Sequence, residues 1–261
     1  MTASPLPRFS PIVARLRASG CVFAEQEAEL LIEAARDAVE LEQLVVRRVS
    51  GLPLEHVVGW AEFCGERITV GPGVFVPRRR TELLVEQALA LAPDNPCIIE
   101  LCCGSGAISA VLLTRLKGIR LYATDLDPIA VRCARENLPP DRVFEGDLFT
   151  PLPSELTGRA DLVIANAPYV PAPALELLPP EARLHEPQIA LDGGSDGLDV
   201  LRRVIAQARE WLAPGGSLIV QGSELQAGEL AQIIARHGLS PSVVIRRDLD
   251  DATALIGTLN P

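Results

Sequence analysis

The run Cys102-Cys103-Gly104-Ser105-Gly106 has the composition of a turn that can bring the backbone close to a ligand. It follows the apolar run 97–101 and precedes a helical pattern over 107–113. Glycine allows close backbone approach, and the first N–H groups of a helix are free to contact a bound group. A strand, a glycine turn and a helix in this order form the opening unit of a nucleotide-binding α/β fold, although such a turn can also be purely structural.

Asp125 ends the predicted strand 118–124 and lies 21 positions after Gly104 (125 − 104). An acid about 20 residues beyond the glycine turn suits a bidentate contact with two ribose hydroxyls. The turn does not have the G-x-G-x-x-G pattern that dinucleotide-binding enzymes use for a pyrophosphate. Together these features favour a nucleoside ligand without phosphates, and S-adenosylmethionine is the cofactor we expect.

The run Asn166-Ala167-Pro168-Tyr169 directly follows the predicted strand 161–165. The amide oxygen of Asn166 and the carbonyl of Ala167 can both accept hydrogen bonds from an NH₂ group, while Pro168 stiffens the turn and Tyr169 offers a stacking face. This arrangement suits a planar nitrogen nucleophile, either a carboxamide or the exocyclic amine of a base. The alternative interpretation is an ordinary turn.

The remaining pattern predicts the elements that position these residues. Residues 8–50 are predicted to be helical, with one periodicity over 24–49, and residues 58–70 to form a β-hairpin. Strands and helices then alternate, which predicts a mostly parallel sheet covered on both faces, with the ligand at the carboxyl ends of the strands. The predicted strands are 97–101, 118–124, 142–145, 161–165, 217–220, 243–246 and 252–257, the last two as a hairpin, and the predicted helices are 82–91, 107–113, 128–138, 198–212 and 224–237, with a turn at 213–216.

Composition limits the function further. The chain has 261 residues, of which 48% are hydrophobic, so one large α/β domain and a small accessory domain can form cores. The net charge of −10 argues against a broad nucleic-acid surface. Six cysteines without C-x-x-C spacing predict reduced thiols, with no disulfide and no metal site; redox-sensitive Cys102 and Cys103 are the alternative. We expect no signal peptide and no transmembrane helix, hence a cytoplasmic protein, and we expect a monomer.

Several runs together resemble the HemK-type protein-(glutamine-N5) methyltransferases, which methylate the glutamine of a Gly-Gly-Gln motif in peptide-chain release factors. The resemblance extends from Leu54 to the C-terminus. Besides the turns at 102–106 and 166–169 and the strand ending at Asp125, it rests on the runs Pro53-Leu54-Glu55-His56, Ala61-Glu62-Phe63, Val76-Pro77-Arg78, Thr81-Glu82, Gly146-Asp147-Leu148-Phe149 and Leu191-Asp192-Gly193-Gly194.

The resemblance implies a Rossmann-like, class I S-adenosylmethionine-dependent methyltransferase domain with a seven-stranded, mostly parallel sheet. We place a helical domain at 1–57, a β-hairpin linker at 58–77 and the methyltransferase domain at 78–261. By resemblance, Asn166, Ala167, Pro168 and Tyr169 grip the target amide of a release factor or another glutamine-containing protein. The implied cofactor-binding residues are Glu100, Cys102, Cys103, Gly104, Ser105, Gly106, Asp125, Asp147, Leu148 and Asn166.

The sequence departs from the family pattern near the site, and other functions stay open. Ala167 replaces a proline, Cys102 a glycine and Glu100 an aspartate, while Arg79 and Arg80 replace a proline and an acid. A different protein or peptide target is therefore compatible with the sequence. The alternatives are an adenine-N6 methyltransferase, which uses a similar Asn-Pro-Pro-aromatic turn on a flipped base, a small-molecule N-methyltransferase, and an inactive cofactor-binding scaffold.

Overall fold

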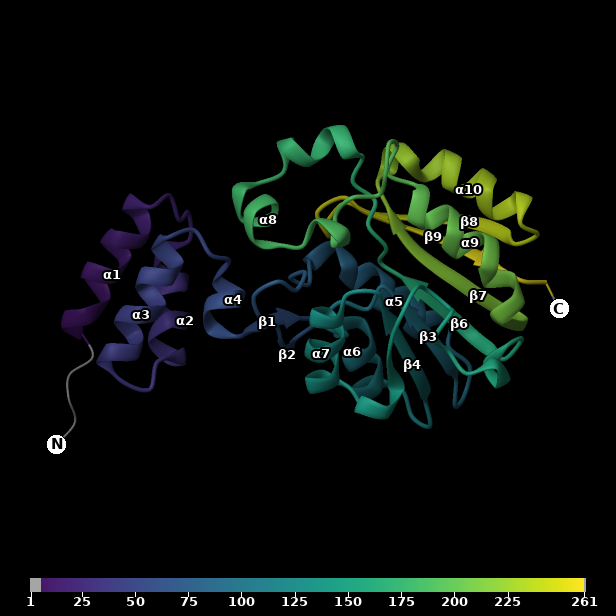
Figure 1. Cartoon of the computed structure of the whole chain (residues 1–261), viewed down its shortest axis with the longest axis horizontal. Helices are drawn as coiled ribbons and strands as arrows, with labels where there is room; N and C mark the ends of the chain where they lie inside the picture. The colour runs from purple at the N-terminus through teal and green to yellow at the C-terminus, as the bar shows by residue number, and fades with distance from the viewer. Residues whose placement is uncertain (1–5, 261) are drawn as a thin grey trace.

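The computed structural model describes residues 6–260 and contains a seven-stranded sheet (Figure 1). Its strand order is β5-β4-β3-β6-β7-β9-β8, and every neighbouring pair is parallel except the two pairs that involve β9. The strands are β3 Cys97–Leu101, β4 Arg120–Asp125, β5 Val143–Glu145, β6 Ala160–Ala165, β7 Leu212–Gly222, β8 Ser240–Arg246 and β9 Ala252–Thr258. The predicted fold class, including the final hairpin, is confirmed.

Helices cover both faces of this sheet because neighbouring residues on each strand point to opposite sides. On one face, Ile98 and Ile164 join the hydrophobic cluster that includes α5, α6 and α7. On the other, Ile99 and Val163 join the cluster that includes α9 and α10. The bounds of these helices are α5 Glu82–Leu91, α6 Ala107–Arg115, α7 Pro128–Asn137, α9 Asp199–Trp211 and α10 Ala227–Arg236.

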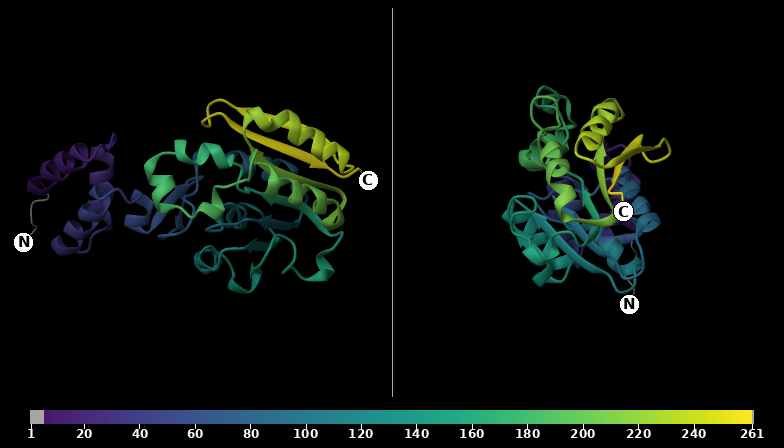
Figure 2. Two further views of the ribbon diagram at one scale, coloured as in Figure 1. Left: turned by 45° about the horizontal axis from the view of Figure 1, so that its top comes forward. Right: turned by 90° about the vertical axis from the view of Figure 1, so that its right-hand side faces the viewer.

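The helices before the sheet extend from one end of the molecule, opposite the C-terminus (Figure 2). They form a hydrophobic cluster of their own, and the antiparallel hairpin of β1 and β2 connects them to the rest. The elements are α1 Leu6–Ala18, α2 Ala24–Ala34, α3 Ala38–Val49, α4 Leu54–Val58, β1 Trp60–Phe63 and β2 Glu66–Thr69. The domain boundaries at residues 57 and 77 stay predictions, and residues 1–5 of the first predicted domain lie outside the described residues.

Two local predictions need correction, and one set of elements was not predicted. The helical pattern over 24–49 is two helices, because Asp37 has extended backbone and caps α3 by accepting hydrogen bonds from the N–H groups of Val39 and Glu40, both at 2.9 Å. The predicted turn at 213–216 lies within β7, which pairs with β6 across a register shift. The long connection after β6, for which the sequence predicted no elements, contains α8 Pro180–His185 and two short 3₁₀ helices.

Candidate active site

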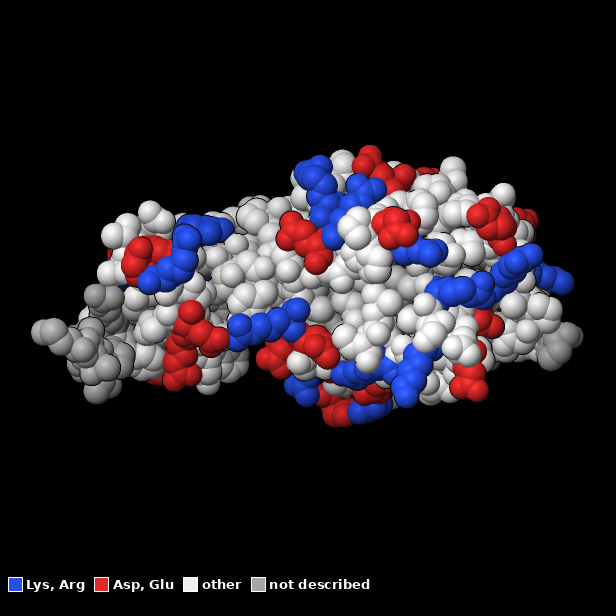
Figure 3. Space-filling model, turned by 90° about the horizontal axis from the view of Figure 1, so that it is seen from below, with Lys and Arg blue, Asp and Glu red and all other residues white. Residues whose placement is uncertain are grey.

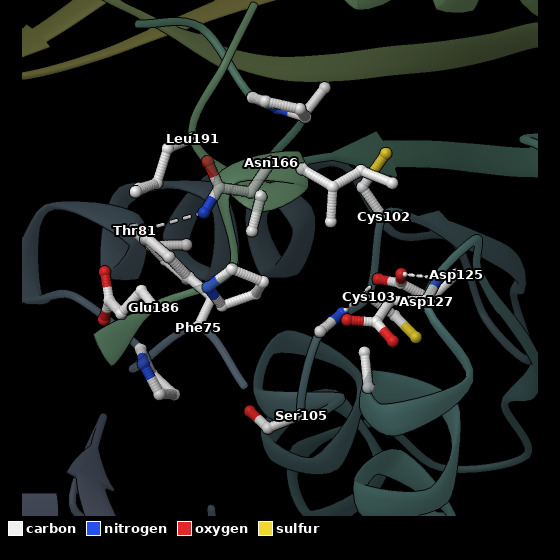
Figure 4. Close-up of a pocket in the computed structure, with 18 of the residues that line it drawn as sticks. Phe75, Thr81, Cys102, Cys103, Ser105, Asp125, Asp127, Asn166, Glu186 and Leu191 are labelled. Carbon is white, nitrogen blue, oxygen red and sulfur yellow. Dashed lines mark hydrogen bonds between the residues drawn. The ribbon is translucent and has the colours of Figure 1, made fainter. Parts of the chain in front are cut away.

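A cleft of about 460 Å³ opens at the carboxyl ends of β3, β4 and β6 (Figure 4). The turn after β3, the acid at the end of β4 and the turn after β6 all line it. On the other side it is lined by residues of the segment before α5 and of the long connection after β6. The predicted site residues that line the cleft are Glu100, Cys102, Cys103, Gly104, Ser105, Asp125, Asp147, Leu148, Asn166, Ala167, Pro168 and Tyr169.

The glycine turn packs tightly on its inner side. Gly106 has φ +75°, and a Cβ there would lie 2.7 Å from Cδ1 of Leu138. Any side chain at this position would be both strained and in collision, which explains the glycine. Cys102 also has a left-handed backbone, with φ +54°, a conformation that is uncommon for a residue other than glycine. Gly106 is thus a structural member of the turn, while residues 102–105 line the cleft.

Asp125 is held by two backbone N–H groups at the open end of β4. The N–H of Gly104 donates to Oδ2 at 2.8 Å, and the N–H of Asp127 donates to Oδ1 at 2.9 Å. Burial raises the pKa of Asp125, and these backbone hydrogen bonds oppose that rise. Each carboxylate oxygen can accept more than one hydrogen bond. The carboxyl group is therefore fixed in position and retains acceptor capacity at the edge of the cleft.

Glu100 has a different environment, although it belongs to the same wall. It is 2% exposed, and its Oε2 accepts hydrogen bonds from the Ser109 hydroxyl and from the Ser109 N–H, the latter at 3.0 Å. Burial raises the pKa of Glu100 to about 7. Because its carboxyl group is engaged by α6, Glu100 connects the strand and helix that flank the glycine turn.

The environment of the two cysteines of the turn favours the protonated thiol. Burial, assisted by the negative charge of Asp125, raises the pKa of both Cys102 and Cys103. Cys103 packs in the hydrophobic cluster with α6, whereas Cys102 is half-buried. Because the thiolate is the reactive form, this environment disfavours the redox-sensing alternative.

Asp147 and Leu148 follow β5, a fourth strand whose carboxyl end reaches the cleft. The Asp147 carboxylate forms an ion pair with Arg203 of α9. Leu148 is buried and has φ +49°, so its backbone is held in a left-handed conformation. The Leu148 side chain offers an apolar surface to the cleft, and the Asp147 carboxylate already has a partner.

The orientation of Asn166 is set by Thr81, a residue of the segment before α5. Asn166 donates from Nδ2 to the Thr81 hydroxyl at 3.4 Å, a contact visible in Figure 4. Among the described residues, none donates a hydrogen bond to Asn166 Oδ1 or to the carbonyl of Ala167. Two acceptors on consecutive residues are therefore available beside the cleft.

Tyr169 is held at both ends by two glutamines, Gln221 near the end of β7 and Gln226 after it. Gln221 donates from Nε2 to the Tyr169 hydroxyl at 3.3 Å, and Gln226 donates from Nε2 to the Tyr169 carbonyl at 3.1 Å. Gly197, with φ +81°, packs against the same carbonyl, since a Cβ there would lie 2.3 Å from the oxygen. The ring beside the Asn166 turn is thus fixed by contacts from a different part of the chain.

Two ion pairs fasten the opposite wall of the cleft. Glu186, whose side chain is fully buried, pairs with Arg78 at 2.6 Å and accepts from the Val76 N–H at 3.1 Å. At the other end of α8, Glu181 pairs at 2.8 Å with Arg48, which also pairs with Glu27. The long connection after β6 is therefore attached both to the hairpin linker and to the N-terminal helices.

Comparison with known proteins assigns this arrangement to a family. Residues 67–177 match the family described as Methyltransferase small domain. A release factor glutamine methyltransferase from Streptomyces coelicolor is 40% identical over 201 residues, which cover 75% of this chain and 71% of that protein. The chain belongs to the release factor glutamine methyltransferase family. The predicted family, and with it the prediction of a protein-(glutamine-N5) methyltransferase, is confirmed.

Solved structures at lower identity support the fold of this methyltransferase. A methyltransferase from Pyrococcus furiosus is 15% identical with a TM-score of 0.58, covering 76% of this chain and 91% of that one. The 16S rRNA N2 G1207 methyltransferase of T. thermophilus, solved with AdoMet and guanosine, is 19% identical with a TM-score of 0.52, covering 77% of this chain and 44% of that one. At these identities the likeness concerns the fold alone.

Several residues that line the cleft had no role predicted from the sequence. Thr81, Arg78 and Leu191 stood in runs used for the resemblance, but nothing in the sequence showed that Thr81 contacts Asn166. Gln221 and Glu186 are likewise distant in sequence from the residues they hold. The roles of all the predicted site residues stay predictions. In the part of the chain that the structure describes, no helix is long and apolar enough to span a bilayer.

The pKa of Glu100 predicts a pH-dependent stability. A carboxyl group whose folded-state pKa lies near 7, above an unfolded value of about 4.3, stabilises the fold most when it is protonated. This contribution is complete below about pH 4.3 and is lost as the pH rises through about 7, by up to about 3 kcal/mol. Glu100→Gln, which keeps an acceptor for Ser109, should therefore gain stability relative to the native protein between pH 5.5 and pH 8.

Urea unfolding of both proteins at these two pH values measures the difference. Ser109→Ala serves as a control, because it removes the hydroxyl partner but leaves the titrating carboxyl in place. A free-energy difference between the native protein and Glu100→Gln that is the same at both pH values would contradict the assignment.

Proposed function

We propose that this methyltransferase uses S-adenosylmethionine to methylate the side-chain amide nitrogen (N5) of a glutamine in a peptide-chain release factor. The observation that carries the proposal is the acceptor pair of Asn166 Oδ1 and the Ala167 carbonyl, beside the same cleft as Asp125. The family supports it as well, because its members carry this activity in their name.

The residues at the Asp125 end fit the proposed cofactor. Asp125 is positioned by two N–H groups and keeps acceptor capacity for two ribose hydroxyls. A Cβ on Gly104 would meet no atom within 4 Å, so the glycine leaves open space on the cleft side of the turn. Residues 102–105 would hold the amino-acid part and Leu148 would pack against the base. When bound, the cofactor supplies an electrophilic methyl group carried on a sulfonium.

The acceptor pair suits a carboxamide because of the weakness of that nucleophile. The nitrogen lone pair of a carboxamide is delocalised into its carbonyl. Hydrogen bonds from its two N–H groups to Asn166 Oδ1 and to the Ala167 carbonyl orient the nitrogen and favour a localised lone pair. The fixed ring of Tyr169 stacks on the planar amide. These residues act by positioning and by electrostatic stabilisation of the charge that develops on nitrogen.

Each carboxylate that lines the described part of the cleft already has a hydrogen-bond or ion-pair partner, so we assign no general base. Histidine is absent from the lining, and His56 is buried against the Val74 carbonyl at 2.8 Å. Glu100 is engaged by Ser109, and Glu186 by Arg78. The proposed reaction therefore depends on the alignment of the amide rather than on prior removal of its proton, and the proton that the nitrogen loses on methylation would pass to solvent.

A flipped adenine could use the same acceptor pair, but the charge of this protein favours a protein substrate. The net charge is −10, and the face seen in Figure 3 has Lys and Arg interspersed with Asp and Glu. Affinity for nucleic acid depends on clustered cations that contact phosphates.

Asp125→Ala should weaken S-adenosylmethionine binding. Loss of a charge-assisted pair of ribose hydrogen bonds should cost about 1.5–3 kcal/mol, or roughly one to two decades in Kd. Calorimetry checks this, with Asp141→Ala as the control, because Asp141 is exposed before β5 and does not line the cleft. Equal affinity of the native protein and Asp125→Ala would refute the ribose assignment.

The substrate proposal predicts the site of the methyl group. A Gly-Gly-Gln-containing release factor, incubated with enzyme and S-adenosylmethionine, should gain one methyl group on that glutamine, as located by tandem mass spectrometry of its peptides. A release factor with this glutamine changed to alanine should gain none. Methylation of an adenine-containing DNA oligonucleotide in the same experiment, with the release factor untouched, would overturn the proposal in favour of the adenine-N6 alternative.

A further inference from the structure

The arginines that line the cleft differ in whether their charge is neutralised. Arg78 pairs with Glu186 at 2.6 Å, and Arg203 pairs with Asp147. Arg80 lines the same cleft and is exposed, and over residues 6–260 no carboxylate oxygen lies within 4.0 Å of its side-chain nitrogens. Arg80 is therefore the cleft arginine whose guanidinium has no carboxylate partner within the described structure.

The position of Arg80 places this charge at the acceptor end of the cleft. Its neighbour Thr81 contacts Asn166, the residue proposed to hold the target amide. Figure 4 shows Thr81 and Glu186 on one side of the cleft, and Asp125 on the other. Arg80 precedes Thr81 in the short 3₁₀ helix Arg79–Thr81 and lines the cleft with an exposed side chain, so its guanidinium lies on the Thr81 side of the cleft.

The carboxylates of the same wall do not compete for Arg80. Glu186 has a fully buried side chain bonded to Arg78, and Glu181 is paired with Arg48. Across the cleft, beside Asp125, Asp127 caps α7 by accepting from the Ile129 N–H at 2.8 Å. An unpaired guanidinium beside a binding site favours a carboxylate ligand. Its planar N–H donors match the two carboxylate oxygens in geometry, and its positive charge complements their negative charge.

We propose that Arg80 is a specificity-determining residue that binds a carboxylate of the acceptor protein close to the target glutamine. The inference rests on the proposed function and adds to it a preference for an acidic neighbour of the modified residue. The amino-acid carboxylate of the cofactor has the same chemistry, but the exposed position of Arg80 favours the carboxylate of the incoming protein.

The test uses a set of release factor variants that differ next to the Gly-Gly-Gln motif. Each of the two positions before the motif and the two positions after it carries Asp, Asn or Lys in turn, and kcat/KM is measured for each variant. At low salt the native enzyme should prefer Asp over Asn by about 3–5-fold at one or more positions, the strength of an exposed ion pair. Arg80→Gln should bring this ratio close to 1, and Arg80→Glu should reverse it in favour of Lys. Added salt should reduce the native preference.

Arg79→Gln is the matched control. Arg79 does not line the cleft, and its charge acts instead on Asp248, whose pKa is lowered chiefly by Arg246. This variant should keep the native ratio. Calorimetry with S-adenosylmethionine shows whether Arg80 binds a carboxylate of the acceptor protein or the carboxylate of the cofactor. If Arg80 binds the acceptor protein, Arg80→Gln should keep the Kd for the cofactor within about 2-fold of the native value.

Each other outcome contradicts the inference in a distinct way. If the native enzyme has equal kcat/KM values for the Asp and Asn release factors and still methylates both, the proposed role of Arg80 is overturned and the proposed function stands. A loss of cofactor affinity in Arg80→Gln without a change in the Asp:Asn ratio assigns Arg80 to the cofactor instead. Absence of glutamine methylation on every release factor overturns both the proposed function and the inference.

Discussion

The register of three parallel strands brings the residues of the proposed active site together. Leu101 of β3 is opposite Thr124 of β4 and Ala165 of β6. Cys102, Asp125 and Asn166 each follow directly after these three residues. The glycine turn, the acid proposed to bind ribose and the asparagine proposed to hold the target amide therefore reach one edge side by side. A shift of either neighbouring strand by one residue would turn these side chains to the opposite face. Burial of both faces of the sheet holds this register.

Contacts from distant parts of the chain then fix the side chains at that edge. Thr81 orients Asn166, and Gln221 and Gln226 hold Tyr169. The wall opposite the sheet is attached through Glu186, which pairs with Arg78 and accepts from the N–H of Val76 in the hairpin linker. The same wall reaches the N-terminal helices through the ion pair of Arg48 with Glu181. The accessory helices are thus linked to the acceptor side of the cleft, and not only to the domain that they precede.

The fold could be predicted from the sequence because its signals are local. Apolar runs marked all seven strands of the sheet, and glycine and proline marked most of the turns between them. The acid at the end of β4 could be placed near the glycine turn by its distance along the chain, since parallel strand ends meet at one edge. The division of residues 24–49 into two helices was missed, because the apolar periodicity continues through the capping residue Asp37.

The contacts that complete the site could not be predicted in this way. Asn166 and Thr81 are separated by 85 positions, and Arg78 and Glu186 by 108. Partners at such distances depend on how the long connection folds over the sheet, and this connection has short helices without a strong period. The charge state of Glu100 was equally hidden, because it depends on complete burial rather than on residue type.

The most direct test is to measure both kcat and the Kd for S-adenosylmethionine in the Asn166→Ala variant. This change removes one acceptor for the amide and leaves the Asp125 end of the cleft intact. We predict that kcat for release factor methylation falls by about 100-fold or more, as expected for a group that positions the reacting atom. Kd for S-adenosylmethionine should stay within about 3-fold of the native value. A parallel loss of binding and turnover, or a kcat close to that of the native enzyme, would contradict the role of Asn166 in gripping the target amide.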